Sequence, residues 1–430
     1  MSKASISTLY LHQLSLVFFF LFSKLLLSAN SATHPADVQV LKDLKNGVDP
    51  RSIAPGSCLS SWDFSMDLDP CHNIFTDHFT CGLRCDRLVF GLLRVTEITL
   101  DPVGYSASLS SLSWNLPFLN TLDISDNSFS GSLPDSFSNL TRLRRLGLSG
   151  NSLTGEIPAV LGSLPHLEEL YLDNNHLHGP IPWSFNNLTR LKRLEIQRNY
   201  ISGELPDLAS LKSLYFLDAS DNNISGGVPS TLPLSLVELS MRNNKLRGNI
   251  PDSIDKIRFL QVLDLSHNML YGAISSVVFK HPSLEQLTLS YNNFSLLQVP
   301  GDKGSSSSLI ALDLSYNKLR GLLPAFMASM PKLTALSLEH NEFTGMIPAQ
   351  YAVKAAVPGN DNTSSFERLL LGGNYLFGPI PGPLMGLKPG SADVSLVDNC
   401  LYRCPDAFFF CRGRDQKSLV DCKSFGPTIP

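Results

Sequence analysis

Eight cysteines are the residues of this chain whose chemistry is easiest to infer from type and spacing. They fall into two groups of four, one near each end: Cys58, Cys71, Cys81 and Cys85, then Cys400, Cys404, Cys411 and Cys422. Even numbers of cysteines in an exported chain indicate disulfides, and the grouping predicts two local sets of crosslinks. Each set allows three pairings, and the spacing does not select among them. A zinc site is the alternative, which the absence of any Cys-x-x-Cys pair disfavours.

No other spacing in the sequence is typical of a catalytic site. The chain lacks His-Glu-x-x-His, a phosphate-binding loop and a Gly-x-Ser-x-Gly elbow with partner residues. Residues such as Asp264 and His267 recur with a longer repeat and are interpreted as solvated surface residues. The sequence therefore predicts a protein that is not an enzyme and that uses no cofactor and no metal ion.

Charged and aromatic side chains that recur at steps of about 24 residues are the candidates for recognition. Arginine beside exposed aromatic residues is typical of the anchors of binding surfaces. The candidate partner-binding residues are Arg145, Glu169, Tyr171, Asp173, Arg193, Glu195, Gln197, Phe216, Asp218, Glu238 and Arg242. A structural ladder is an equally favoured interpretation. Arg145, Glu169 and Arg193 alternate in sign, and such cross-strand pairs contribute roughly 0.2–1 kcal/mol each without any ligand.

These side chains belong to a motif that repeats along most of the chain. Leu122-Asp123-Ile124-Ser125-Asp126-Asn127 recurs as Leu146-Gly147-Leu148-Ser149-Gly150-Asn151. The asparagine continues at similar steps, with one longer step before Asn374: Asn175, Asn199, Asn222, Asn244, Asn268, Asn292, Asn317, Asn341, Asn374 and Asn399. About a dozen copies at one spacing predict a repeat architecture over residues 95–399.

Each copy of the motif predicts one short strand followed by a turn. The Leu-x-Leu alternation points leucines inward and the intervening residues outward. The asparagine is expected to bond backbone groups of adjacent turns, and the following Gly-x-Leu/Ile-Pro ends the strand pairing. Stacked coils predict a parallel sheet on a concave face, which would carry the candidate residues. Stability would then be a sum over neighbouring coils.

The start of the chain predicts its compartment. Lys3 precedes an apolar run from Leu14 to Leu27, and small residues follow. Residues 1–32 are therefore predicted to be a secretory signal peptide, since the run is shorter than the roughly 20 residues that span a bilayer. No further apolar segment or lipid-anchor signal follows. We expect a secreted protein of the apoplast or cell wall, with a peripheral position at the plasma membrane as the alternative location. A formal net charge of −4 excludes a global basic field and disfavours nucleic acid as a partner.

Two cysteine-containing segments flank the repeats. Residues 33–94 are predicted to form an N-terminal cap, with an amphipathic helix at Val38, Leu41, Leu44 and Val48. Residues 400–430 are predicted to form a C-terminal cap, in which Phe408, Phe409 and Phe410 cover the open end of the leucine core. The long step between asparagines marks an insertion at residues 350–365, for which a plain surface loop is favoured.

Five Asn-x-Ser/Thr sequons are candidate glycosylation sites: Asn139, Asn187, Asn223, Asn293 and Asn362. The first two follow the Gly-x-Leu/Ile-Pro turn. They are expected on the convex side, where glycans would leave the concave face open and favour a monomer in the absence of ligand.

The repeat resembles a known family. Leu167-Glu168-Glu169-Leu170-Tyr171-Leu172-Asp173-Asn174-Asn175 through Gly179-Pro180-Ile181-Pro182 resembles the plant-type leucine-rich repeat. The resemblance implies an α/β-type repeat solenoid, a horseshoe or superhelix with a parallel concave sheet and disulfide-stapled caps. The N-terminal cap departs from the family pattern, because it has four cysteines where two are usual. The family's disulfide pairing is therefore not carried over.

The resemblance also implies a function. Plant receptor-like kinases and receptor-like proteins bind peptides, hormones, microbial patterns or co-receptors on such horseshoes. This chain has no kinase motifs. We expect a non-catalytic extracellular protein that binds a peptide or protein partner, such as a receptor-kinase ectodomain, through its concave face in signalling or defence. The alternative is an inhibitor of a cell-wall-degrading enzyme, similar to the polygalacturonase inhibitors.

Overall fold

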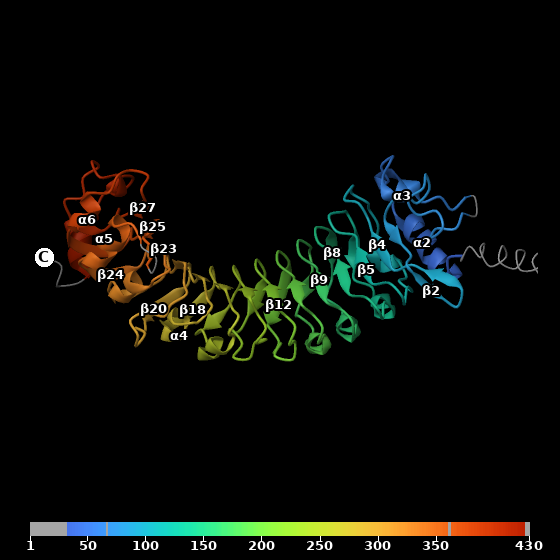
Figure 1. The fold of residues 1–430 in the computed structure, drawn as a ribbon, viewed down its shortest axis with the longest axis horizontal. Coiled ribbons are helices and arrows are strands. Elements are labelled where there is room, and N and C mark those ends of the chain that lie inside the picture. The colour runs from blue at the N-terminus through green and yellow to red at the C-terminus, as the bar shows by residue number, and fades with distance from the viewer. Residues whose placement is uncertain (1–31, 66–67, 360–362, 426–430) are drawn as a thin grey trace, which may run out of the picture.

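The computed structural model describes residues 32–65, 68–359 and 363–425, which form one elongated arc (Figure 1). One cap lies at each end of the arc, and the repeats lie between them. The predicted signal peptide lies outside the described residues, apart from residue 32, and so does the sequon at Asn362.

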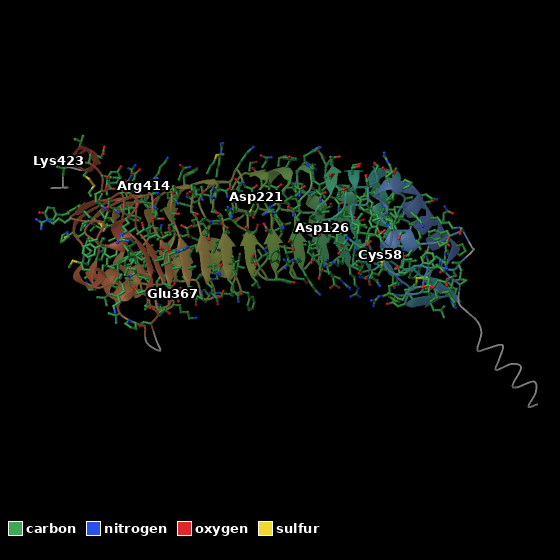
Figure 2. The ribbon with its side chains drawn as sticks, turned by 90° about the horizontal axis from the view of Figure 1, so that it is seen from above. Cys58, Asp126, Asp221, Glu367, Arg414 and Lys423 are labelled. Atoms are coloured by element: carbon green, nitrogen blue, oxygen red, sulfur yellow. A yellow bond between two sulfur atoms is a disulfide. The ribbon has the colours of Figure 1, made fainter. Side chains whose placement is uncertain are left out.

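A single long sheet lines the inner face of the arc. Within the described residues it has 14 strands, and neighbouring strands run parallel except for the first pair, β1 and β4. The strands are β1 (Leu83–Arg84), β4 (Glu97–Thr99), β5 (Thr121–Asp123), β7 (Arg145–Gly147), β9 (Glu169–Tyr171), β11 (Arg193–Glu195), β13 (Phe216–Asp218), β15 (Glu238–Ser240), β17 (Val262–Asp264), β19 (Gln286–Thr288), β21 (Ala311–Asp313), β23 (Ala335–Ser337), β25 (Arg368–Leu370) and β27 (Asp393–Ser395). Figure 2 looks down on these strands, which lie side by side along the arc.

Shorter sheets form the side of the arc that follows the asparagines. Their strands are β6 (Ser130–Ser132), β8 (Ser152–Thr154), β10 (His178–Gly179), β12 (Tyr200–Glu204), β14 (Asn223–Ser225), β16 (Arg247–Gly248), β18 (Met269–Ile274), β20 (Asn293–Leu297), β22 (Arg320–Leu322), β24 (Glu342–Gly345), β26 (Tyr375–Pro379) and β28 (Cys400–Tyr402). A glycine near the end of many of these strands has a positive φ, as Gly179 does at 77°. A side chain would be strained in that conformation, which explains the recurring glycine.

Short helices form the outer side of the arc (Figure 1). They are η2 (Leu109–Ser111), η3 (Asp135–Asn139), η4 (Ala159–Ser163), η5 (Trp183–Asn187), η6 (Asp252–Lys256), α4 (Ser276–Phe279), η7 (Ala325–Ser329), α5 (Ala349–Ala356) and α6 (Gly382–Met385). The sequons at Asn139 and Asn187 are the exposed last residues of η3 and η5. They therefore lie on the convex side, as expected from the sequence.

The core is a continuous column of leucines closed by a ladder of asparagines. The central residue of each three-residue strand of the long sheet is apolar and buried, as Leu194 and Leu217 are. Asn268 is typical of the ladder: its Nδ2 donates to the carbonyls of Met241, Leu265 and Ser266, and its Oδ1 accepts from the Leu246 amide. The asparagine thus satisfies backbone groups of two adjacent coils that no strand pairing reaches. The predicted repeat solenoid is confirmed.

The N-terminal cap contains α2 (Pro35–Gly47), η1 (Pro50–Ser52), α3 (Cys58–Ser61) and a hairpin of β2 (Arg87–Val89) and β3 (Leu92–Arg94). Leu41, Leu44 and Val48 are buried as predicted, whereas Val38 is half-buried and Val40 takes its place in the core. Two disulfides close the cap, Cys58–Cys81 and Cys71–Cys85.

The C-terminal cap contains η8 (Phe409–Cys411) and α7 (Leu419–Phe425). Phe410 is buried and stacks on Phe408 with ring centroids 5.3 Å apart, which confirms that the aromatic run packs over the core. The disulfides Cys400–Cys422 and Cys404–Cys411 close this cap. All eight cysteines are therefore paired near the two ends of the chain, as predicted.

The prediction of a plain surface loop at residues 350–365 is wrong. Its first half continues α5, where Tyr351, Ala352 and Ala355 are buried against the repeat core. The physical reason is spacing: these three residues share one helical face, and Pro348 occupies the N-cap position. The extra residues therefore add a second turn of helix to the outer side.

Candidate recognition surface

The candidate residues lie on the concave face, as their alternation with buried leucines requires. The first outward row runs Arg145, Glu169, Arg193, Phe216 and Glu238, in register on adjacent strands. A second row includes Tyr171, Glu195 and Asp218, and a third row follows the strands at Asp173, Gln197 and Arg242. The structure therefore brings all 11 candidates together across five neighbouring strands and the turns behind them.

The side chains at the N-terminal end of this surface are paired with each other. Arg145 Nη1 lies 2.6 Å from Glu169, and Nη2 lies 3.2 Å from Asp123. The guanidinium also lies 4.3 Å from the ring centroid of Tyr171, whose hydroxyl donates to Glu169 at 3.0 Å. Burial raises the pKa of the Tyr171 phenol. The carboxylate of Asp173 accepts from Ser149 and from Asn174. This part of the surface matches the structural-ladder interpretation.

The next strand is also internally satisfied, with one exception. Arg193 Nε donates to Glu195, and its guanidinium lies 3.6 Å from the ring centroid of Phe216. Gln197 Nε2 donates to Glu195 at 3.0 Å, but Gln197 Oε1 is buried without a hydrogen-bond partner.

The next two strands, β13 and β15, carry carboxylates that have no cationic partner. Asp218 accepts hydrogen bonds from the amide and hydroxyl of Ser220, and Glu238 occupies the next strand. Neither they nor Asp264 form an ion pair with any described residue. Burial is the main cause of the raised pKa of Asp218. Burial also raises the pKa of Glu238, with the Asp218 charge as the second cause. Negative charge is therefore concentrated where the surface is least satisfied internally.

A hollow of about 340 Å³ borders Asp218 and Asp264. It is lined by Asn174, Gln197, Arg198, Asp218, Ser220, Asp221, Ser240, Arg242 and Asp264. Arg242 is exposed and has no side-chain partner among the described residues, so the hollow offers both signs of charge.

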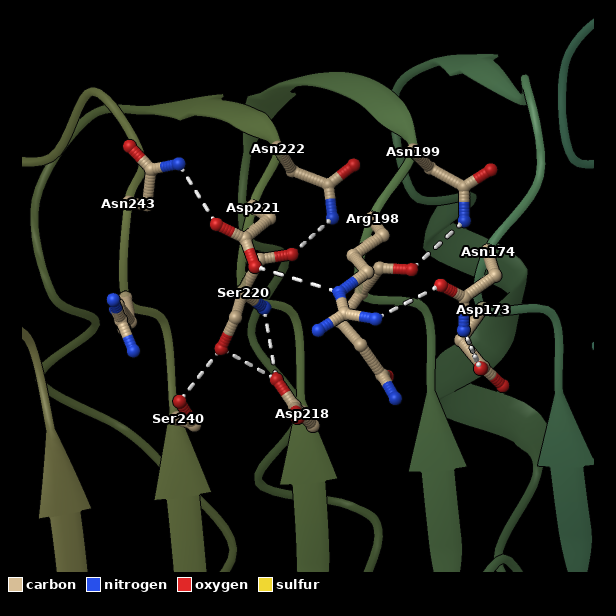
Figure 3. Close-up of polar contacts among 12 residues, drawn as sticks. Asp173, Asn174, Arg198, Asn199, Asp218, Ser220, Asp221, Asn222, Ser240 and Asn243 are labelled. Atoms are coloured by element: carbon tan, nitrogen blue, oxygen red, sulfur yellow. Dashed lines mark hydrogen bonds and ion pairs between the residues drawn. The ribbon is translucent and has the colours of Figure 1, made fainter. Parts of the chain in front are cut away.

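One side of the hollow is a polar rim that the sequence interpretation missed. Arg198 Nη1 donates to Asn174 Oδ1 at 3.3 Å, and Asn243 Nδ2 donates to Asp221 Oδ1 at 2.8 Å (Figure 3). Each rim residue immediately precedes a ladder asparagine or its equivalent and has a positive φ, as Arg198 does at 54°. The sequence signal that could have found this rim is the position immediately before each ladder asparagine. In four successive repeats that position holds Asn174, Arg198, Asp221 and Asn243.

Replacing Glu238 by glutamine is expected to stabilise the free protein at neutral pH. A raised carboxyl pKa in the folded state means that the ionised group destabilises the fold above that pKa. Protonation removes this penalty as the pH falls, so the difference should vanish below about pH 4. Because Glu238 is partly solvent-screened, we expect a gain of at most about 1 kcal/mol at pH 7. Urea unfolding at pH 7 and pH 4 measures it.

The matched control is Glu204→Gln, which replaces an exposed carboxylate at the end of β12. This variant is expected to unfold at the same urea concentration as the parent at both pH values. A destabilised Glu238→Gln at pH 7 would contradict the assignment of unfavourable charge to the concave centre.

Metal-binding groups and membrane-spanning helices were also sought among the described residues. Among the described residues, no group of three or more His, Cys, Asp or Glu side chains is arranged to hold a metal ion. None of the helices in the described ranges combines the length and apolar character needed to cross a bilayer.

Comparison with protein families and with curated sequences finds proteins that are similar to this chain over part of its repeats. The family model described as a leucine-rich repeat region matches residues 104–357. Lumican from Bos taurus is 37% identical over 115 residues, which are 27% of this chain and 26% of lumican. Receptor like protein 23 from Arabidopsis thaliana is 33% identical over 119 residues, which are 27% of this chain and 13% of that protein. The chain thus matches about a quarter or less of the length of these curated relatives.

Solved structures with the same fold include plant receptors. A plant peptide hormone receptor, RGFR1, in complex with RGF2 has a TM-score of 0.60 at 33% identity, over 66% of this chain and 44% of that chain. A TDR receptor has a TM-score of 0.55 at 28% identity, over 71% of this chain and 56% of that chain. A plant ice-binding protein has a TM-score of 0.53 at 22% identity, over 90% of this chain and all of that chain, and shows the shared fold alone.

Proposed function

The chain belongs to the leucine-rich repeat family, and we propose that it is a non-catalytic extracellular recognition protein that binds a peptide or protein partner on its concave face. The observation that carries this proposal is the contrast along one surface. Arg145, Glu169 and Arg193 form ion pairs with neighbouring side chains, whereas Asp218, Glu238 and Arg242 form none with any described residue. A structural ladder explains the first group and leaves the second without a role.

The chemistry of the unsatisfied part suggests what the partner presents. Carboxylates that burial and mutual repulsion destabilise gain most from an added cation, so a lysine or arginine side chain over Asp218 and Glu238 fits best. An amide donor would satisfy Gln197 Oε1. Arg242 would pair with a carboxylate or carbonyl of the same partner. An extended basic segment lying across β11, β13, β15 and β17 can meet all three requirements.

The relatives support a receptor-like role for such a face. The plant receptor whose solved structure resembles this one holds a peptide hormone. The paired cysteines are typical of proteins that fold in an oxidising compartment. We therefore propose that residues 1–32 direct export, that residues 33–94 and 400–430 cap the solenoid, and that the protein acts in apoplastic signalling or defence.

A random peptide library selected against the full chain tests the proposal. We expect the selected peptides to be enriched in lysine and arginine. We also expect the double variant Asp218→Asn/Glu238→Gln to bind them at least about tenfold more weakly, because both partly buried carboxylate partners of the bound cation are lost. Isothermal titration of individual synthetic peptides measures the affinities.

The control is Glu204→Gln, which removes an exposed carboxylate from β12 and should leave the affinities unchanged. Selected peptides that lack basic residues, or that bind the double variant as tightly as the parent, would overturn the proposal. Tyr171→Ala provides a second comparison. Because Tyr171 belongs to the internally paired part, its loss should weaken binding less than loss of the carboxylates.

A further inference from the structure

Two rows of side chains run along the edge of the long sheet where its strands begin. The first row holds the residue immediately before each strand, and the second holds the residue three positions before it. In the repeats of β7, β9 and β11 the rows contain five basic or imidazole side chains and one carboxylate: Arg144, Glu168 and Lys192, then Arg142, His166 and Arg190. This edge lies across the strands from the polar rim.

Figure 2 shows the two edges on opposite sides of the strands. Asp221 of the polar rim lies on one side, and Glu367, which holds the first-row position before β25, lies on the other. The two rows are therefore accessible to a partner that does not touch the hollow on the concave face.

Backbone hydrogen bonds fix the spacing of the first row. The Glu168 amide donates to the Arg144 carbonyl at 2.7 Å, and the Lys192 amide donates to the Glu168 carbonyl at 2.7 Å. The Tyr215 amide continues the ladder to the Lys192 carbonyl at 3.0 Å. Side chains in each row therefore repeat about every 4.8 Å along a nearly straight line.

Positive charge on this edge exceeds what its carboxylate can neutralise. Glu168 lies 3.2 Å from Arg144 and 2.7 Å from Lys192, and its hydrogen bond to Lys192 is the main cause of its lowered pKa. Arg190 and Lys212 are exposed and have no ion pair with any described residue.

The cations continue to the N-terminal hairpin. Arg87 and Arg142 lie 5.4 Å and 4.9 Å from the ring centroid of Phe118, which holds the second-row position before β5. Arg94 contacts the same ring at 4.4 Å but is neutralised by Asp37. The cationic edge thus consists of four basic residues of the two rows, Arg87 of the hairpin, and Lys212, which lies one position before the second-row residue of β13. The four row residues are Arg142, Arg144, Arg190 and Lys192.

The same edge is not cationic in the C-terminal half. There the first row carries Glu285 and Glu367, and the second row carries Phe259, Ser283 and Lys332. The net charge of the whole chain is −4, so the cationic edge is a local feature that composition alone conceals. Repeat geometry therefore does not require basic residues at these positions.

We propose that the cationic edge binds an extended acidic polysaccharide, a polymer of uronic acid residues, at a surface separate from the concave face. Arginine and lysine recur on alternate strands of each row, along a nearly straight line, which complements a linear chain that carries regularly spaced carboxylates better than it complements a compact anion. Tyr215 and Phe259, 41% and 65% exposed, continue the two rows and provide ring faces for sugar stacking. The paired cysteines are typical of proteins that fold in an oxidising compartment, which disfavours an intracellular polyanion such as nucleic acid.

Titration of the full chain with de-esterified oligogalacturonate of about ten residues tests this assignment. We expect binding at 50 mM NaCl that weakens strongly at 300 mM, because exposed ion pairs are screened. The double variant Arg190→Gln/Lys212→Gln should lose roughly fivefold to tenfold in affinity. Lys332→Gln, which lies at the repeat position of Arg190 in the C-terminal half, is the control and should lose nothing.

Four results would overturn the assignment: no binding at 50 mM NaCl, equal losses in the double variant and in Lys332→Gln, equal affinity for a fully methyl-esterified oligomer, or equal affinity for anionic phospholipid vesicles. The first two remove the cationic edge as a site, and the last two remove the acidic polysaccharide as its partner. The concave variant Glu238→Gln should bind the oligomer like the parent, which separates this result from the test of peptide recognition.

Discussion

Replacing Asp37 by alanine is expected to lower the free energy of unfolding of the N-terminal cap by about 3–5 kcal/mol. Asp37 is fully buried on α2, and its carboxylate accepts from Arg94 Nε at 2.9 Å, Arg94 Nη2 at 2.6 Å and the Val95 amide at 3.0 Å. Removing the carboxylate leaves a buried guanidinium and a buried amide without partners. Because a buried charge without a counter-ion is far less stable than the pair, this loss should exceed that of any surface change.

The control for Asp37 is Asp43→Ala on the exposed side of the same helix, where the carboxylate accepts only from Gln39. It should change stability by less than about 0.5 kcal/mol. Urea unfolding, followed by hydrogen exchange of α2 and β3, measures both variants. A second variant, Asp37→Leu/Arg94→Met, removes both charges and should recover most of the loss. An Asp37→Ala protein as stable as Asp43→Ala would contradict the role of the ion pair.

Replacing Asn268 by alanine is expected to cost about 3 kcal/mol or more. The change removes four hydrogen bonds in the core and leaves the Leu246 amide and the carbonyls of Met241, Leu265 and Ser266 underbonded. Each buried backbone group left without a partner costs roughly 1–3 kcal/mol. In a solenoid the damage should spread to the two coils that share the asparagine, β15 and β17, before it reaches the caps.

Asn249→Ala is the matched control, because this asparagine is exposed and lies outside the ladder. Its effect should stay within about 0.5 kcal/mol. Hydrogen exchange by mass spectrometry reports the opening of individual coils. Uniformly faster exchange along the whole chain in Asn268→Ala would contradict nearest-neighbour coupling. Unchanged exchange would contradict the structural role of the ladder.

The repeat alone predicts most of the fold. The Leu-x-Leu alternation and the asparagine step fix which residues are buried, which face inward and in what order the strands pair. The candidate residues therefore fall on one face, as predicted from their positions. Glycine and proline at fixed offsets predict the turns for the same reason.

Features that depend on contacts between distant residues were not accessible from the sequence. Four cysteines in one cap allow three pairings, and only the packing of α3 against the turn at Cys81 selects Cys58–Cys81. The helix in the insertion could not be predicted, because it depends on the burial of Tyr351 in the core of the repeats. The division of the concave face into paired and unpaired charges depends on rotamers, as Arg145 shows by reaching both Asp123 and Glu169.

The most direct test of the central claim is a hydrogen-exchange footprint of a selected basic peptide on the full chain. If the concave face is the recognition surface, the peptide should protect β11, β13, β15 and β17 together with the turns that carry Gln197 and Arg242. The outer helices and the caps should exchange as in the free protein. Protection confined to the outer helices η4 to η6, with unchanged exchange in the four concave strands, would contradict it.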